Sequence, residues 1–202
     1  MRKADLRKNH QSLDDAIARY RAFMRKILGA ERVIKAQTEK RDLAESVLLR
    51  LCANWESFVD EHLADCVNVD HSKLGEFFAV KIPANPSKGL CQALIFGSGY
   101  KDFKSIGDLK GFSKKILPDS SNPFLKIGKA HSDRIDEVYT IRNYLAHYSA
   151  PGTRSLKALY KAKYGMNNFL EPGQFLLGYK GKRLWAYFDA FEGASQDIAS
   201  SY

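Results

Sequence analysis

Three polar residues suited to acid–base chemistry lie close together in the second half of the chain: Arg142, Asn143 and His147. Histidine titrates near neutral pH, so His147 suits the role of general acid or general base. Arginine is permanently charged and can hold two phosphate oxygens through two N–H groups, so Arg142 suits the stabilisation of negative charge. Asn143 could orient a phosphate or the imidazole of His147. Together these residue types fit proton transfer at a phosphate.

The segment that carries these residues is predicted to be one helix, from Ser132 to about Ser149, with Pro151 and Gly152 beyond its end. Arg142 falls in the middle of an apolar arc of roughly 120° on this helix. The arc consists of Ile135, Val138, Tyr139, Leu145 and Ala146. Because burying an unpaired guanidinium is costly, either Arg142 pairs with a carboxylate in the core or this face opens onto a cleft or a partner.

Helix geometry separates the two charged candidates. Asn143 and His147 are four residues apart and share one side of the helix. Arg142 and His147 lie about 7.5 Å apart along the axis and about 140° apart around it. One helix therefore does not aim both at a single atom. The long arginine side chain could close part of this gap, and a second copy of the helix, related by a two-fold axis, could supply the rest.

The run Arg142-Asn143-Tyr144-Leu145-Ala146-His147 resembles the R-N-x-x-x-H signature of the HEPN superfamily, all-α proteins that include many ribonucleases. The segment ANWESFVDE (residues 53–61) is similar to the helix that precedes this motif in several prokaryotic branches. Tyr148 and Ser149 stand where a glycine often follows the histidine. The resemblance covers about residues 42–164.

The resemblance implies a metal-independent endoribonuclease that has no cofactor. The RNA 2′-OH would attack the adjacent phosphate and leave a 2′,3′-cyclic phosphate and a 5′-OH. Arg142, Asn143 and His147 would be the catalytic residues, and Tyr148 and Glu56 would support them. Glu56 borders an apolar stripe and could pair with Arg142, although a solvated helix carboxylate is the alternative.

The resemblance also bears on partners. It implies a homodimer whose motif helices face one cleft, a toxin or antiviral-defence role, and a possible antitoxin or nucleotidyltransferase partner. The alternative is a non-catalytic RNA-binding or dimerisation module, in which Arg142 anchors an interface. A weaker alternative is a nucleotide-sensing domain, which would show a closed pocket in place of an open basic groove.

The charge balance agrees with a polyanionic partner. The 202 residues carry a net charge of +9 and give a pI of about 9.4, which favours association with nucleic acid. Lys157, Lys161 and Lys163 follow the motif and could contact the RNA backbone; plain surface lysines are the alternative.

Helical periodicity predicts an all-α bundle of four to five main helices, forming one domain over residues 1–202. A first helix is capped by Ser12 and stops at Gly29. A long helix from about Val33 to Val69 has a core-facing stripe: Leu48, Leu51, Cys52, Trp55, Phe58, Val59, His62 and Cys66.

After this helix, residues 70–130 are predicted to be an irregular helical insertion with short pieces at 73–78, 87–96 and 105–117. A basic helix is expected from about Arg154 to Tyr164. The last helix is expected over Lys182–Ala199, with one apolar side: Leu184, Phe188, Phe191 and Ile198. A short strand at 175–179 is left open.

The cysteines predict neither a disulfide framework nor a zinc ribbon, because Cys52, Cys66 and Cys91 are odd in number and form no C-x-x-C pair. His62 and Cys66 have the four-residue spacing of metal ligands, but they lie in an apolar stripe. A buried core histidine is the favoured interpretation, and no metal site is expected. The charged N-terminus is unlike a signal peptide, and no apolar run is long enough to span a bilayer. A soluble, cytoplasmic protein is therefore expected.

Overall fold

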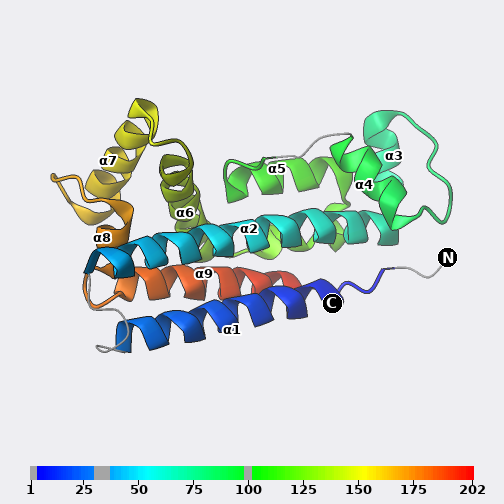
Figure 1. The fold of residues 1–202 in the computed structure, drawn as a ribbon. Coiled ribbons are helices and arrows are strands. Elements are labelled where there is room, and N and C mark those ends of the chain that lie inside the picture. Colours follow the sequence, from blue (N-terminus) through cyan, green and yellow to red (C-terminus); the bar gives the residue numbers. More distant parts are fainter. Residues whose placement is uncertain (1–3, 30–36, 98–101) are drawn as a thin grey trace.

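A 33-residue helix, α2 (Gln37–Val69), runs the length of the molecule, and α1 (Lys8–Gly29) and α9 (Lys182–Ala199) lie along it (Figure 1). The computed structural model describes residues 4–29, 37–97 and 102–202, and within these ranges the regular structure is helical with no strand. The all-α prediction is confirmed. No helix of this part of the chain has the length and apolar content needed to cross a membrane.

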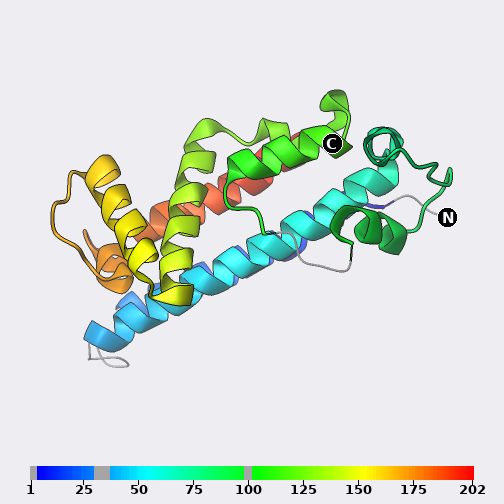
Figure 2. The same cartoon turned by 90° about the horizontal axis from the view of Figure 1, so that it is seen from above.

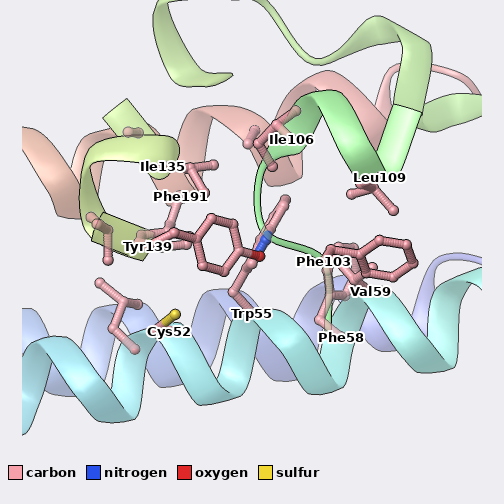
Figure 3. Close-up of a cluster of buried hydrophobic side chains, with 14 of the residues drawn as sticks. Cys52, Trp55, Phe58, Val59, Phe103, Ile106, Leu109, Ile135, Tyr139 and Phe191 are labelled. Carbon is pink, nitrogen blue, oxygen red and sulfur yellow. The ribbon is translucent and has the colours of Figure 1, made fainter. Parts of the chain in front are cut away.

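The stripe predicted on α2 is buried at every position. It forms the centre of the core, where Trp55 packs against Phe191 of α9 with ring centroids 5.6 Å apart. Figure 3 shows Trp55 and Phe191 beside Ile135 and Tyr139, so three helices meet at this point. All four apolar residues predicted on α9 are also buried. The expected start of α2 at Val33 lies outside the described residues.

The first helix begins earlier than predicted. α1 starts at Lys8, so Ser12 lies inside the helix and is not its cap. The reason is tertiary: His10 in the added turn is 6% exposed and packs against Phe58 and His62, and its Nδ1 lies 3.2 Å from Ser195 Oγ. Burial of His10 therefore extends α1 towards the N-terminus beyond Ser12, a residue that would suit the N-cap position.

Residues 70–130 are more regular than expected. They form α3 (Ser72–Phe78), α4 (Lys88–Phe96) and α5 (Ile106–Ile116), followed by two 3₁₀ turns, η1 (Asp119–Ser121) and η2 (Pro123–Lys126). The three expected helical pieces are confirmed. Ser87 and Ser105 cap α4 and α5, because each hydroxyl accepts a hydrogen bond from the backbone N–H three residues later.

The motif helix, α6 (Lys129–His147), begins three residues before Ser132, so the predicted start is wrong. Gly128, the N-cap residue of α6, has no side chain to cap the helix. Its backbone N–H donates to Asp197 Oδ2 of α9 at 2.8 Å, so a distant residue anchors this end of α6. The helix stops at His147 because Tyr148 adopts a left-handed conformation, with φ of 44°.

α7 (Ala150–Tyr164) follows at once and is longer than the predicted basic helix. Ser149 caps it by accepting a hydrogen bond from Gly152 N at 3.2 Å, so Ser149 belongs to the next helix and not to the end of α6. Pro151 and Gly152 lie in its first turn and not in a loop, because proline is tolerated where no backbone donor is needed. The segment left open near Phe175 is a short helix, α8 (Pro172–Leu177).

Candidate functional site

Arg142, Asn143 and His147 line one open cavity of about 420 Å³. The cavity lies between the end of α6, the beginning of α7 and the segment just before α5. Its other lining residues are Asp102, Lys104, Thr140, Ser149, Pro151, Gly152 and Ser155. A single chain thus brings the three motif side chains to one cavity, although they leave the helix axis in different directions.

The turn at Tyr148 shapes this cavity. Its left-handed backbone folds α7 back so that Ser149, Pro151 and Gly152 form one wall. The Tyr148 side chain is 66% exposed and packs 5.3 Å from the Tyr144 ring, and it is not among the residues that line the cavity. Tyr148 therefore shapes the cavity through its backbone conformation, and its side chain is not part of the cavity wall.

Two alternatives were expected for Arg142, namely pairing with a carboxylate or a position facing a cleft. The structure shows both, because Arg142 pairs with a carboxylate and also borders the cavity. Its Nη2 lies 3.7 Å from Glu56 Oε1, and its Nη1 donates to Asn143 Oδ1 at 3.2 Å. The side chains of Arg142 and Glu56 are 26% and 15% exposed. The pairing foreseen for Glu56 is present, but 3.7 Å is longer than a hydrogen bond, so the attraction acts through space.

The charge of Glu56 acts on its neighbours along α2. Burial, and then the charge of Glu56, raise the pKa of Asp60 to about 6. Burial and Glu56 also raise the pKa of the Cys52 thiol, and the opposing effect of Arg142 is smaller. Cys52 is therefore held as a thiol and is no candidate nucleophile, since the thiolate is the reactive form.

The apolar arc around Arg142 is covered by the chain itself. Ile135, Val138, Tyr139 and Leu145 are buried, whereas Ala146, the fifth residue of the arc, is exposed. The α6 helix is buried on a second side as well, through Glu137, Ile141 and Tyr144. The apolar arc is therefore covered within one chain and does not by itself require a second copy of the chain to cover it.

A buried carboxylate on α6 ties the helix to α7 and α9. Glu137 is 4% exposed, and its Oε2 accepts hydrogen bonds from Tyr164 at 2.6 Å and from Tyr187 at 3.0 Å. Arg134 also donates to both Glu137 and Tyr164. This network fixes the angle between α6 and α7, the two helices whose junction forms the cavity. Sequence patterns give no sign of it, because its members are up to 53 residues apart, from Arg134 to Tyr187.

Lys104 is a cation of the cavity that was not predicted from the sequence. It lies in the segment before α5, which is docked on α6 where Asp136 Oδ1 accepts a hydrogen bond from Ile106 N at 2.7 Å. Nothing in the local sequence distinguishes Lys104 from the other lysines of residues 70–130. Figure 2 shows α5 beside α6, on the same side of α2.

The three lysines expected to contact RNA lie on the surface of α7, and none lines the cavity. Lys157 and Lys161 project roughly 200° and 240° around the helix from Ser155, which does line it. Lys157 Nζ instead lies 5.6 Å from the centre of the Phe169 ring. Any contact of these lysines with RNA would be outside the cavity.

His62 is a buried core histidine, as favoured from the sequence. Its Nε2 lies 2.6 Å from the Tyr202 hydroxyl, and burial lowers its pKa to about 3. The Cys66 sulfur lies 3.7 Å from the same hydroxyl. Among residues 4–29, 37–97 and 102–202, no group of three or more His, Cys, Asp or Glu residues could hold a metal ion.

Comparison with protein-family profiles, curated proteins and solved structures found no match for this chain. The resemblance to HEPN proteins therefore remains a resemblance of the motif residues and their helical context. Any function assigned to the cavity must rest on its own side chains.

Proposed function

We propose that this protein is a metal-independent endoribonuclease of the HEPN type and that the cavity at the junction of α6 and α7 binds the scissile phosphate. One observation carries the proposal: Arg142, Asn143 and His147, chosen from their residue types and spacing, line the same open cavity. An open cavity suits a polymeric substrate better than the closed pocket expected of a nucleotide sensor.

His147 is exposed at the last position of α6, where a substrate can reach its imidazole. In the proposed reaction His147 takes the proton from the ribose 2′-OH, and the 2′-oxygen attacks the adjacent phosphorus. The bond from phosphorus to the 5′-oxygen then breaks. That oxygen takes up a proton, so the products are a 2′,3′-cyclic phosphate and a 5′-OH.

Arg142 stabilises the negative charge that develops on the phosphorane oxygens. Its guanidinium has five N–H donors, of which Asn143 receives one in the free protein. Glu56 lies on the other side at 3.7 Å and restrains the guanidinium without a hydrogen bond. In this proposal Glu56 and Asn143 position Arg142, and Lys104 adds a second cation at the rim.

A homodimer remains part of the proposal, because the leaving 5′-oxygen needs a proton donor and His147 of a second copy could serve. Light scattering at micromolar concentration should then give about twice the chain mass of 22.8 kDa. Mixing Arg142→Ala and His147→Ala proteins under subunit exchange tests whether one site draws on two chains. Recovered cleavage would mean a composite site, and no recovery would mean that each chain supplies its own pair.

The second candidate is a non-catalytic RNA-binding or dimerisation module. The pairing of Arg142 with Glu56 and Asn143 favours it, because a guanidinium held in this way also suits a structural anchor. His147 separates the two candidates, since only the ribonuclease needs it for chemistry.

The test uses a mixed-sequence pool of single-stranded RNA in buffer containing EDTA. Wild-type protein should cut the pool and leave 2′,3′-cyclic phosphate ends, identified by mass spectrometry. His147→Ala should lower the cleavage rate by about 100-fold or more, with an unchanged melting temperature because His147 is exposed. His71→Ala, a change remote from the cavity, is the control and should cut normally. Normal cleavage by His147→Ala, or cleavage that EDTA removes and added metal restores, refutes the proposed mechanism.

A further inference from the structure

The turn between α8 and α9 holds an exposed tyrosine in an unfavourable backbone conformation. Tyr179, Lys180 and Gly181 follow one another in the left-handed region, with φ of 52°, 58° and 78°. Side chains other than glycine rarely adopt this region. Tyr179 is 75% exposed, more than any other large apolar side chain that the structure describes. The packing of this chain therefore gives no reason for an aromatic ring at this position.

Arg183 supports the Tyr179 ring from the inner side of the turn. The Cζ atom of Arg183 lies 4.8 Å from the centre of the Tyr179 ring, 4.3 Å from that of Phe175 and 5.1 Å from that of Tyr164. Its Nη1 donates a hydrogen bond to the Phe175 carbonyl oxygen at 3.1 Å. A Cβ on Gly178 would lie 2.6 Å from this nitrogen, so glycine makes room for the guanidinium. Tyr179 is therefore the exposed member of three rings that surround one fixed cation.

The elements around Tyr179 carry most of the positive charge of the chain. Residues 150–188 contain seven lysines and arginines and one carboxylate, Glu171, so they account for +6 of the net charge of +9. The Glu171 carboxylate already accepts a hydrogen bond from the Tyr144 hydroxyl at 3.0 Å. The neighbouring start of α2, residues 37–45, has three carboxylates and two cations and removes only one charge. This end of the molecule is therefore complementary to a polyanion.

Five of these cations lie on both sides of the exposed ring. Tyr164, the last residue of α7, contacts Arg183, so the end of α7 adjoins the turn. We call this region the Tyr179 surface; it consists of Lys161, Lys163, Tyr179, Lys180, Lys182 and Arg183, and its four lysines are exposed. Figure 1 shows α7, α8 and the beginning of α9 together at one end of the molecule.

We infer that the Tyr179 surface binds an unpaired nucleotide of a single-stranded RNA outside the cavity that Arg142, Asn143 and His147 line, an inference that rests on the proposed ribonuclease function. The base stacks on the exposed ring of Tyr179, which accepts any base because every base has a π face. The surrounding cations contact the neighbouring phosphates. Lysines alone would suit any polyanion, whereas the exposed ring favours one that also carries unpaired aromatic bases.

The Tyr179 surface lies apart from the motif cavity. Ser155 lines that cavity, and Tyr164 contacts Arg183. These two residues of α7 are about 13 Å apart along the helix axis. Lys161 projects roughly 240° around the helix from Ser155. An RNA must therefore pass over α7 to occupy both places, so the Tyr179 surface contributes affinity and takes no part in the chemistry.

Binding is measured separately from cleavage. The probe is a fluorescein-labelled, mixed-sequence 12-nucleotide RNA with 2′-O-methyl groups, which lacks the attacking hydroxyl and cannot be cut by the proposed reaction. Fluorescence anisotropy gives its affinity over a range of salt concentrations. Tyr179→Gly should weaken binding about 10-fold, because the stacking of one base is lost, whereas Tyr179→Phe keeps the ring and should bind like the wild type. Lys180→Ala should reduce the slope of log K against log salt by about 0.7.

Two matched controls lie on the opposite end of the molecule, at α3 and just after it (Figure 1). Phe77 and Lys81 are exposed there. Phe77→Ala and Lys81→Ala should leave the affinity and the slope nearly unchanged. Because glycine accepts a φ of 52° more readily than tyrosine, Tyr179→Gly should melt no lower than the wild type. Weaker binding by this variant then does not come from loss of folding.

Other partners of the Tyr179 surface give different results. Equal affinity for a 12-base-pair duplex would overturn the inference, because a duplex keeps its bases inside and offers none to Tyr179. Equal losses for Phe77→Ala and Tyr179→Gly would overturn it as well. Vesicles of phosphatidylcholine and phosphatidylserine test for a membrane contact. Vesicle binding that Tyr179→Gly abolishes, with RNA binding unchanged, would assign the surface to a membrane and overturn the inference.

Cleavage separates this inference from the proposed function. With a cleavable 12-nucleotide RNA, Tyr179→Gly should raise KM about 10-fold with little change in kcat. The variant should also lose the preference of the wild type for this RNA over a dinucleotide, which leaves Tyr179 unoccupied when bound in the motif cavity. Cleavage with an unchanged KM would overturn the inference and leave the ribonuclease standing. Binding that depends on Tyr179 without any cleavage by the wild type would refute the ribonuclease and leave the RNA-binding surface standing.

Discussion

Removing the Tyr187 hydroxyl should destabilise the protein through the carboxylate that holds α6 against α7 and α9. Tyr187 is fully buried and donates to Glu137 Oε2 at 3.0 Å. Burial, and then the charge of Glu137, raise the pKa of Tyr187, so the hydroxyl keeps its proton and stays a donor. Tyr187→Phe keeps the ring and deletes only this donor.

The magnitude follows from the charge of the acceptor. A hydrogen bond to a charged group contributes about 1.5–3 kcal/mol. Glu137 keeps Tyr164 and Arg134 as donors after the change, so its charge is not left unpaired. We therefore expect a loss of about 2 kcal/mol, which in a chain of this size lowers the melting temperature by about 4–8 °C.

A second buried tyrosine provides a control with the opposite expectation. Tyr160 is 1% exposed, and its hydroxyl has no hydrogen-bond partner among the residues that the structure describes. Its ring packs 4.2 Å from Phe175, a contact that phenylalanine preserves. Because an unbonded buried hydroxyl is unfavourable, Tyr160→Phe should leave stability unchanged or raise it by about 1 kcal/mol.

The assay is guanidinium chloride unfolding at pH 7, followed by circular dichroism, for the wild type and both variants. The midpoint should fall for Tyr187→Phe and stay the same or rise for Tyr160→Phe, with unchanged slopes. Equal effects of the two substitutions would refute the reasoning, because they differ only in whether the hydroxyl is bonded to a buried charge. A loss below about 0.5 kcal/mol for Tyr187→Phe would show that Glu137 does not depend on this donor.

Three further predictions concern groups whose environment is unfavourable to them. The pKa of Asp60 is raised in the folded state, so the free energy of unfolding should fall as pH rises from about 4 to 6. Asp60→Asn should therefore stabilise the protein by about 1 kcal/mol at pH 7, after allowance for the partial exposure of Asp60. In denaturant titrations this gain should shrink as the pH is lowered towards 4. The pKa of His62 is depressed to about 3, so its contribution to the free energy of unfolding is present above pH 6.5 and is lost as pH falls towards 3. At pH 5 the wild-type histidine takes up a proton on unfolding, so His62→Phe should reduce the proton uptake on unfolding by about one. An unchanged uptake would contradict the argument that burial lowers the pKa of His62. Gly111→Ala should raise the melting temperature through about 1 kcal/mol of helix propensity, and a decrease would show that an atom does occupy the space beside Gly111.

Periodicity predicted the long elements well, because their buried faces repeat over many turns. The stripe on α2 and the apolar side of α9 are buried at every predicted position. The pieces predicted at 87–96 and 105–117 begin at the serines that cap α4 and α5 in the structure, Ser87 and Ser105, and such a cap depends only on residues within one turn of it.

Helix ends that depend on distant partners could not be predicted. α1 extends past Ser12 because His10 is buried against α2, and α6 begins before Ser132 because Asp197 of α9 accepts from the backbone N–H of its N-cap residue, Gly128. Pro151 was taken for the end of one helix but begins the next, since proline suits both places. Local sequence does not distinguish these cases.

The sequence by itself determined which side chains of α6 are suited to chemistry: Arg142, Asn143 and His147 follow from residue type and spacing alone. Only the tertiary structure decided that they share a cavity with Lys104, a residue 38 positions earlier in the chain than Arg142. The left-handed turn at Tyr148 and the bond from Ile106 N to Asp136 bring the walls of that cavity together. A helical wheel fixes only the direction in which each Cβ leaves the axis, whereas a cavity depends on how far side chains reach and on which elements surround them.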